Sequence, residues 1–257
     1  MAPGMGSPPG GAPKSGPQAD MLPEVDSNIA GDANACFARA EKAFGNKDWL
    51  EAIAYYKHVI VKFSFNVPLS AKSELRLGDV AYERERFEEA RTYYKSFLRL
   101  HPKHDQADYA AFRVGLCAFA EIPGGMFFEP PANERDQTEV RNAAQTMRDF
   151  IKTYPSSARV EEAKAYVTKC EDKLASHEMY VARFYERRKK WPGVALRAEG
   201  LAKTYPSSEL APEALVLAIK AHKELNQPAE AQHALDQLVA LKAPQKFIDQ
   251  GRSTLGK

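Results

Sequence analysis

The chain has 257 residues, of which 44% are hydrophobic and 27% are charged, and its formal net charge at pH 7 is +2. A chain of this size folds into one sizeable domain or at most two, and its balanced charge gives no general attraction for nucleic acid or an anionic surface. No stretch approaches the roughly 18 consecutive apolar residues of a membrane-spanning helix. The three cysteines are widely spaced and show no CxxC pattern, which argues against a disulfide framework or a structural zinc site.

The first expected segment is an arm rich in proline and glycine, covering residues 1–31. Residues 1–23 alone hold five of the fifteen glycines and six of the seventeen prolines. Such a composition cannot bury enough apolar surface to offset the entropy of ordering, so we expect this arm to be disordered. It also lacks the unbroken apolar stretch of a secretory leader, so we expect that export is not encoded in the sequence as printed.

From about Asp32 onward the sequence is typical of helices, and it repeats. The segment TYPSSARVEEA at Thr153 returns as TYPSSELAPEA at Thr204, and a related phrase begins at Arg99. Small residues at two fixed positions and a proline that ends the second helix fit the tetratricopeptide repeat of about 34 residues. We therefore predict an all-α fold, a tetratricopeptide superhelix of about five helix-turn-helix repeats and ten helices.

The predicted repeat domain covers residues 32–243 and leaves residues 244–257 as a C-terminal tail. The second repeat is the clearest, because Gly78, Ala81 and Ala90 supply its small residues and Pro102 closes it. The five repeats have the approximate bounds 33–66, 71–104, 108–155, 157–206 and 208–243.

Two departures from a regular repeat stand out. The third repeat carries extra residues between its helices, in a loop from Glu121 to Gln137 that contains Phe127 and Phe128. Loops of this length are usually functional or disordered, and its apolar residues either fold back into the superhelix or dock on a partner. In addition, neither glycine nor proline occurs between Ser156 and Lys190, and apolar residues recur there at steps of three and four, which predicts one helix of about thirty residues.

The first helices of the repeats carry the side chains that face the concave side of a superhelix. In the first three repeats these positions are rich in aromatic residues, which offer large apolar area at small entropic cost and favour an extended peptide as ligand. The alternative is that the superhelix buries these rings. The predicted client-peptide groove consists of Phe37, Phe44, Leu75, Tyr82, Tyr109, Phe112, Leu116 and Phe119.

The same positions in the last two repeats are charged and include Arg183 and Glu186. A charged surface suits a folded partner better than an extended apolar peptide. His101 and His104, the only close histidine pair, could suit a metal ion if Asp105 or Asp108 joined them, but polar side chains near a helix end are the favoured interpretation. No other polar residues resemble a nucleophile with its base, so we predict a non-catalytic protein without metal or cofactor.

Several stretches, taken in this order, resemble the BamD family, the tetratricopeptide lipoproteins of the bacterial β-barrel assembly machinery. They include DWLEAIAYYKHVI at Asp48, RLHPKHDQADYAAFRVGLCAF at Arg99 and HEMYVARFYERRKKWPGVALRAEGLAKTYP at His177. With the FF…RD loop and TYPSSARVEEAK, the resemblance covers about Ala33 to Lys242.

The resemblance implies a scaffold at the periplasmic face of the outer membrane, associated peripherally and acting as a monomer within a complex. Its C-terminal repeats would dock on the POTRA domains of the barrel-shaped assembly protein, beside other lipoproteins of the machinery. Its N-terminal repeats would engage unfolded outer-membrane proteins, and nucleic acid would play no part. Arg197 and Glu199 match the R-x-E segment of the family, whose arginine is associated with the POTRA contact, and the family loop is matched by Phe127, Phe128, Arg135 and Asp136.

One departure from the family concerns its lipid anchor. Family members carry a signal peptide that ends at a lipidated cysteine, whereas Cys36 follows charged residues and lies within the first predicted helix. We therefore expect Cys36 to be a core residue and the anchor to be absent from this sequence. A second hypothesis is a generic tetratricopeptide adaptor that coordinates an envelope or signalling complex.

Overall fold

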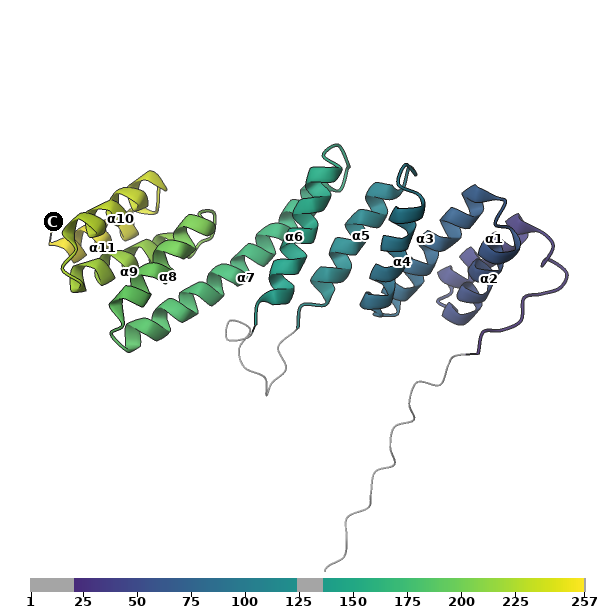
Figure 1. Cartoon of the computed structure of the whole chain (residues 1–257), viewed down its shortest axis with the longest axis horizontal. Coiled ribbons are helices and arrows are strands. Elements are labelled where there is room, and N and C mark those ends of the chain that lie inside the picture. The colour runs from purple at the N-terminus through teal and green to yellow at the C-terminus, as the bar shows by residue number, and fades with distance from the viewer. Residues whose placement is uncertain (1–20, 124–135, 257) are drawn as a thin grey trace, which may run out of the picture. The chain divides into compact units, whose positions relative to one another are not determined.

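The computed structural model describes residues 21–123 and 136–256 of the chain. Within these residues the secondary structure consists of eleven helices, without a strand (Figure 1). The all-α fold class is therefore confirmed. The helices are α1 (Ala33–Gly45), α2 (Trp49–Lys62), α3 (Val67–Glu83), α4 (Phe87–Leu100), α5 (Ala107–Ala120), α6 (Thr138–Thr153), α7 (Val160–Arg187), α8 (Trp191–Thr204), α9 (Ala211–Glu224), α10 (Pro228–Ala240) and α11 (Gln245–Leu255).

The chain divides into two compact units, whose boundary lies inside α3, between Val80 and Ala81. In the first unit, α1 packs on α2. In the second unit, each helix from α4 to α10 packs on the next, and α11 packs on both α9 and α10. The sequence predicted a single repeat domain, and the structure instead distributes the second repeat over both units.

Small residues let the helices of each pair approach one another. A side chain larger than a methyl group at these crossings would force the helices apart, because protein interiors are close-packed. Gly115 takes this place in α5, where an added Cβ would lie only 2.6 Å from Sδ of Met147 in α6. The alanines predicted for the same role are all fully buried, namely Ala40, Ala52, Ala90, Ala143, Ala182, Ala198, Ala218 and Ala231.

Five of the described helices end in the same hydrogen-bonded turn, although the left-handed residue of the turn is not a glycine in any of them. In the turn after α7, the N–H of Lys189 donates to the carbonyl of Glu186 (2.8 Å) and the N–H of Lys190 donates to that of Tyr185 (3.0 Å). These two bonds form a Schellman motif, in which the first donor has a left-handed backbone. A left-handed backbone costs an L-residue roughly 1 kcal/mol. The residues with positive φ at these turns are Lys47, Glu85, Lys189, Asn226 and Lys242.

The long helix expected after the third repeat is present as α7, which has 28 residues. Its buried residues include Ala163, Cys170, Leu174 and Ala182, separated by seven, four and eight positions. This spacing keeps one apolar stripe on the same side of the helix over its whole length. The first half of α7 packs on α6 and the second half packs on α8.

The predicted C-terminal tail is wrong, because residues 245–255 form α11. Ile248 and Gly251 are its buried residues, and a Cβ at Gly251 would lie 3.0 Å from Cδ1 of Ile219 and 3.1 Å from Cδ1 of Leu235. α11 therefore covers the apolar surface that the last repeat would otherwise expose, as a terminal capping helix does in repeat proteins.

The described part of the N-terminal arm is partly anchored on α2. The N–H of Asp26 donates to the hydroxyl of Tyr55 (3.0 Å), and a ring nitrogen of His58 lies 2.9 Å from the carbonyl of Ala30. The buried thiol of Cys36 lies 3.2 Å from the carbonyl of Ile29, which confirms Cys36 as a core residue. Residues 26–31 thus fold onto the first repeat rather than extending freely. None of the helices in the described ranges is both long and hydrophobic enough to span a membrane.

Candidate protein-binding surfaces

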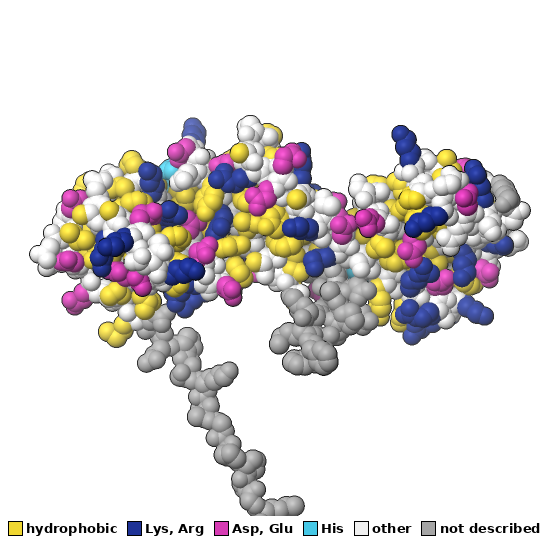
Figure 2. Space-filling view, turned by 180° about the vertical axis from the view of Figure 1, so that it is seen from behind, with side chains coloured by type: hydrophobic (Ala, Val, Ile, Leu, Met, Phe, Trp, Pro, Cys, Tyr) yellow, Lys and Arg dark blue, Asp and Glu magenta, His cyan; other side chains and the backbone are white. Residues whose placement is uncertain are grey.

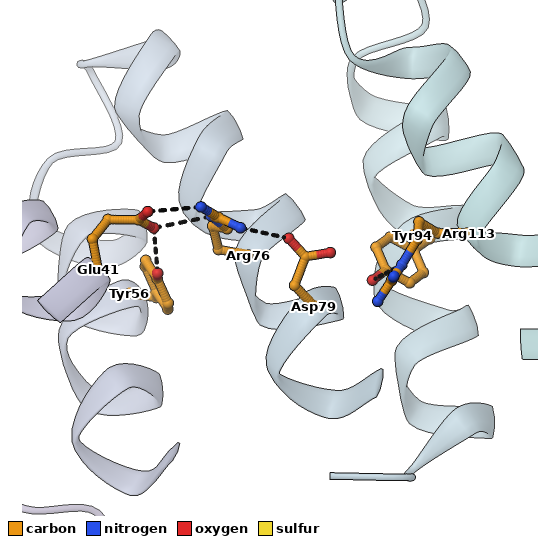
Figure 3. A network of polar contacts seen from close by, with 6 residues as sticks. All are labelled: Glu41, Tyr56, Arg76, Asp79, Tyr94 and Arg113. Atoms are coloured by element: carbon orange, nitrogen blue, oxygen red, sulfur yellow. Dashed lines mark hydrogen bonds and ion pairs between the residues drawn. The ribbon is translucent and has the colours of Figure 1, made fainter. Parts of the chain in front are cut away.

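The first unit holds a charged network of Glu41, Tyr56, Arg76 and Asp79 (Figure 3). Arg76 of α3 forms two hydrogen bonds to Glu41 of α1, at 2.7 and 3.0 Å, and one to Asp79, at 3.1 Å. The hydroxyl of Tyr56 donates to the same Glu41 carboxylate. Burial and this hydrogen bond raise the pKa of Tyr56 above its ordinary value, so the hydroxyl remains a donor at any physiological pH.

The two predicted groove aromatics of this unit, Phe37 and Phe44, are only half accessible. Phe37 packs edge-on against Tyr56, with ring centroids 5.9 Å apart, and Phe44 packs edge-on against Trp49 at 5.5 Å. The guanidinium of Arg76 lies 5.0 Å from the Phe44 centroid. Leu75 is only 3% exposed, so it belongs to the core and cannot line an open groove.

In the second unit the tyrosines of the predicted groove gather around Arg113. Its guanidinium lies 3.8 Å from the ring centroid of Tyr82 and 5.7 Å from that of Tyr109, and its Nε donates to the hydroxyl of Tyr94 (2.9 Å). Arg159 approaches Tyr109 from another side, at 5.0 Å. Both tyrosines are half-buried. This arrangement offers ring faces together with cations, which suits an aromatic ligand that also carries negative charge.

The remaining groove residues of this unit lie at different depths. Phe112 is 4% exposed and packs among Met147, Phe150 and Ala163, so it is a core residue rather than part of a groove. Leu116 is half-buried beside the same cluster. Phe119 is half-buried and makes an edge-on contact with Tyr166 at 4.8 Å.

The sequence analysis missed the charged residues of this surface. Glu41 and Asp79 occupy the same position as Leu116, the ninth of each repeat, but the predicted groove included only the apolar and aromatic side chains of these repeats. Their position was available from the register. Their partners were not, because Arg76 reaches Glu41 from 35 residues away.

The charged positions of the fourth and fifth repeats form one network between α7 and α9. Arg183 donates to Glu186 (2.7 Å) and to Glu213, and Lys220 donates to Glu186 (2.9 Å). Burial alone would raise the pKa of Glu186, but the hydrogen bonds from Arg183 and Lys220 outweigh it and hold the pKa below its ordinary value. The structure therefore brings the two predicted docking residues Arg183 and Glu186 together, already paired.

Arg197 and Glu199, the other predicted docking residues, lie on α8 and have separate partners. Nη1 of Arg197 donates to Glu178 of α7 (2.9 Å), and Glu199 lies 2.8 Å from Nε2 of His222 on α9. Leu196, beside Arg197, is 71% exposed. A recess of about 390 Å³ is lined by Glu178, Leu196, Arg197, Gly200, Thr204 and Tyr205.

Of the predicted loop residues, Phe127, Phe128 and Arg135 lie outside the described residues. Asp136 is exposed, and its Oδ1 accepts hydrogen bonds from the hydroxyl (2.9 Å) and the N–H (3.1 Å) of Thr138. These bonds lower the pKa of Asp136 and hold the carboxylate at the start of α6. Among the described residues no group of three or more His, Cys, Asp or Glu is placed to hold a metal ion.

The face of the molecule seen in Figure 2 carries mixed charge. Acidic and basic side chains are interspersed with hydrophobic ones over the visible face in Figure 2, in agreement with the net charge of +2. Recognition by these surfaces therefore depends on local groups rather than on a general electrostatic field.

Comparisons with known proteins match most of the chain. The family model for outer membrane lipoproteins named YfiO matches residues 29–238. The outer membrane protein assembly factor BamD of Vibrio cholerae serotype O1 is 26% identical over 208 residues, which are 80% of this chain and 83% of that protein. The BamD protein of Neisseria gonorrhoeae is 27% identical over 210 residues, covering 80% and 78% of the two chains.

A solved structure of the TPR2AB domain of yeast Sti1 in complex with pHSP90 covers 82% of this chain and 78% of its own, with 12% identity and a TM-score of 0.43. That similarity is too low to add to the description of the helices. The family model, by contrast, spans α1 to α9 and most of α10. The chain therefore belongs to the YfiO family of outer membrane lipoproteins.

Proposed function

We propose that this protein is a non-catalytic scaffold of the machinery that assembles β-barrel proteins in the outer membrane, acting at the periplasmic face. The observation that carries this proposal is the family match over residues 29–238, together with relatives that are named outer membrane protein assembly factors. Paired helices that present side chains on two faces suit protein binding, and the polar residues described above serve as ion pairs and caps rather than as a reactive group.

We propose the recess beside Arg197 as the docking surface for the POTRA-bearing barrel protein. Arg197 is 41% exposed and its carboxylate partner Glu178 is 22% exposed. Such an ion pair contributes only about 0–1 kcal/mol, so a carboxylate of the partner can replace Glu178 at little cost. A guanidinium binds carboxylates through two parallel hydrogen bonds, and the exposed Leu196 adds apolar surface to be buried next to it.

The test of this docking surface is co-purification of the POTRA-bearing barrel protein with Arg197→Leu. Arg148→Leu provides a matched control, since Arg148 is 42% exposed and pairs with Glu171 at 2.7 Å, between α6 and α7. We expect Arg197→Leu to lose most of the bound partner and Arg148→Leu to retain it. Full retention by Arg197→Leu, or equal loss in both variants, would count against this docking surface.

We propose the half-buried rings as the surface for unfolded outer-membrane proteins. Leu75 and Phe112 are buried and are therefore not part of this surface. In the second unit the surface consists mainly of Tyr82 and Tyr109, and the guanidinium of Arg113 lies close to both rings. An extended chain with aromatic side chains can stack on these rings, and its carboxylates can meet the guanidinium.

The client surface is tested by crosslinking peptides from the C-termini of outer-membrane proteins to the Tyr109→Ala variant. Tyr93→Ala in α4 is the control, since Tyr93 is also a half-buried tyrosine but is absent from the predicted groove. We expect crosslinking to fall several-fold in Tyr109→Ala only, with the circular dichroism of both variants unchanged. Unaltered crosslinking would remove Tyr109 from the client surface.

A further inference from the structure

The turn between α2 and α3, in the first unit, exposes three large apolar side chains. Val61, Phe65 and Val67 are 79%, 80% and 57% exposed, and they lie within seven residues of one another. The ring of Phe65 makes an edge-on contact with the buried Phe63, and the two ring centroids are 6.1 Å apart. Single exposed apolar residues are common, but three at such exposure in one turn mark a surface that is covered by something else.

The chain around this turn is cationic. Between Glu51 and Glu74 the sequence has no acidic residue, and it contains three lysines, Lys57, Lys62 and Lys72. All three lysines are exposed, and none of them forms an ion pair with the described residues. The turn thus combines apolar side chains at its tip with cations beside them.

We propose that this turn inserts shallowly into an anionic lipid surface. Apolar and aromatic side chains enter the region between headgroups and acyl chains, while lysines extend their ammonium groups to the lipid phosphates. The inference rests on the proposed function for its location, because that function places the chain at the outer membrane. It goes beyond that function in giving the protein a direct contact with lipid through Val61–Val67.

A lipid surface explains the turn better than a protein partner does. A stable protein interface buries roughly 800 Å² on each side, which is far more than three side chains of one turn can supply. A bilayer needs no matching shape, and each inserted apolar group and each lysine near the surface adds separately to the affinity.

The proposal is tested by sedimentation of the 257-residue chain with vesicles. We expect binding to vesicles rich in phosphatidylglycerol and weak binding to pure phosphatidylcholine. Phe65→Ser should weaken binding to the anionic vesicles about tenfold, as the loss of one inserted aromatic group predicts. The double variant Lys57→Gln/Lys62→Gln should weaken binding to the anionic vesicles about twentyfold. Added salt should also weaken this binding.

Two matched controls test whether the turn itself makes the contact. Leu100→Ser removes an apolar side chain that is 51% exposed at the end of α4, and Lys189→Gln/Lys190→Gln removes two exposed lysines from the turn after α7. We expect both controls to bind vesicles like the unaltered chain. Equal losses in the controls, or no loss in Phe65→Ser, would overturn the proposal.

Co-purification with the POTRA-bearing protein separates this inference from the proposed function. We expect Phe65→Ser to retain that partner while it loses vesicles. If Phe65→Ser lost a protein partner and kept its vesicle binding, the turn would be a protein interface and the lipid proposal would be wrong. If vesicle binding behaved as expected but Arg197→Leu kept its partner, the docking surface beside Arg197 would fail while the lipid contact stood.

Discussion

Glu186→Gln is the most informative single change in the ion network between α7 and α9. The carboxylate of Glu186 is 16% exposed and accepts hydrogen bonds from Arg183 and Lys220, which are 40% and 49% exposed. Each of these part-exposed pairs contributes about 0.5–1 kcal/mol, so we expect the neutral amide to lower the free energy of unfolding by about 1–2 kcal/mol at neutral pH.

The effect of this substitution should depend on pH in a defined direction. Because the pKa of Glu186 is lowered in the folded protein, its carboxylate stabilises the fold above its ordinary pKa. That stabilisation is lost as the pH falls through the lowered value, when the folded carboxylate becomes protonated. The difference between the unaltered chain and Glu186→Gln should therefore be full at neutral pH and should close below about pH 4.

Urea unfolding followed by circular dichroism at several pH values measures this difference. Glu161→Gln is the control on the same helix, since the Glu161 side chain is 83% exposed in its pair with Lys164 and should contribute almost nothing. A difference for Glu186→Gln that did not change with pH would refute the reasoning. So would an equal effect of Glu161→Gln, because the burial of Glu186 would then have no consequence.

Three further predictions concern the turns, the helix packing and the buried thiols. Glu85→Gly should raise the free energy of unfolding by about 0.5–1 kcal/mol, because residue 85 has a φ of 58°. Glu83→Gly, at the last residue of α3, should instead lower it in the same urea titration. Gly115→Val should cost about 1–3 kcal/mol, and combining it with Met147→Ala should recover part of the loss in a double-mutant cycle, because an added Cβ meets Sδ of Met147 at 2.6 Å. Burial raises the pKa of Cys117 to about 12, and the thiols of the other two cysteines are buried as well. All three thiols should therefore react with Ellman's reagent only after unfolding. Rapid reaction of the folded chain would contradict this expectation.

The features that the sequence predicted well are those that depend on spacing within one helix or one pair. Small residues at the helix crossings were identified because only Ala or Gly fits there, and all are buried. The length of α7 followed from an apolar stripe that no glycine or proline interrupts. Both predictions depend only on the period of the helix, which is visible in the spacing of apolar residues along the sequence.

The eleventh helix was missed although its pattern is present. Phe247, Gly251 and Leu255 recur at steps of four after Pro244, which marks a short amphipathic helix. The repeat pattern does not predict that a further helix is required after α10. The requirement arises because the segment after α10 covers Ile219, Leu235 and Leu238 with a single helix instead of a further pair.

The depth of a side chain and its partner across helices are the properties that repeat register cannot supply. Phe37 and Leu75 share the fifth position of their repeats, yet Phe37 is half-buried while Leu75 is 3% exposed. Phe44, Tyr82 and Glu186 likewise share the twelfth position, where the first two pack edge-on against Trp49 and Phe87 and the third binds two cations. Trp49, Phe87 and Lys220 each lie on a different helix from the residue that they contact. A binding surface in such a protein is therefore defined by pairs of helices, and a substitution tests recognition only if the contacts on both helices are known.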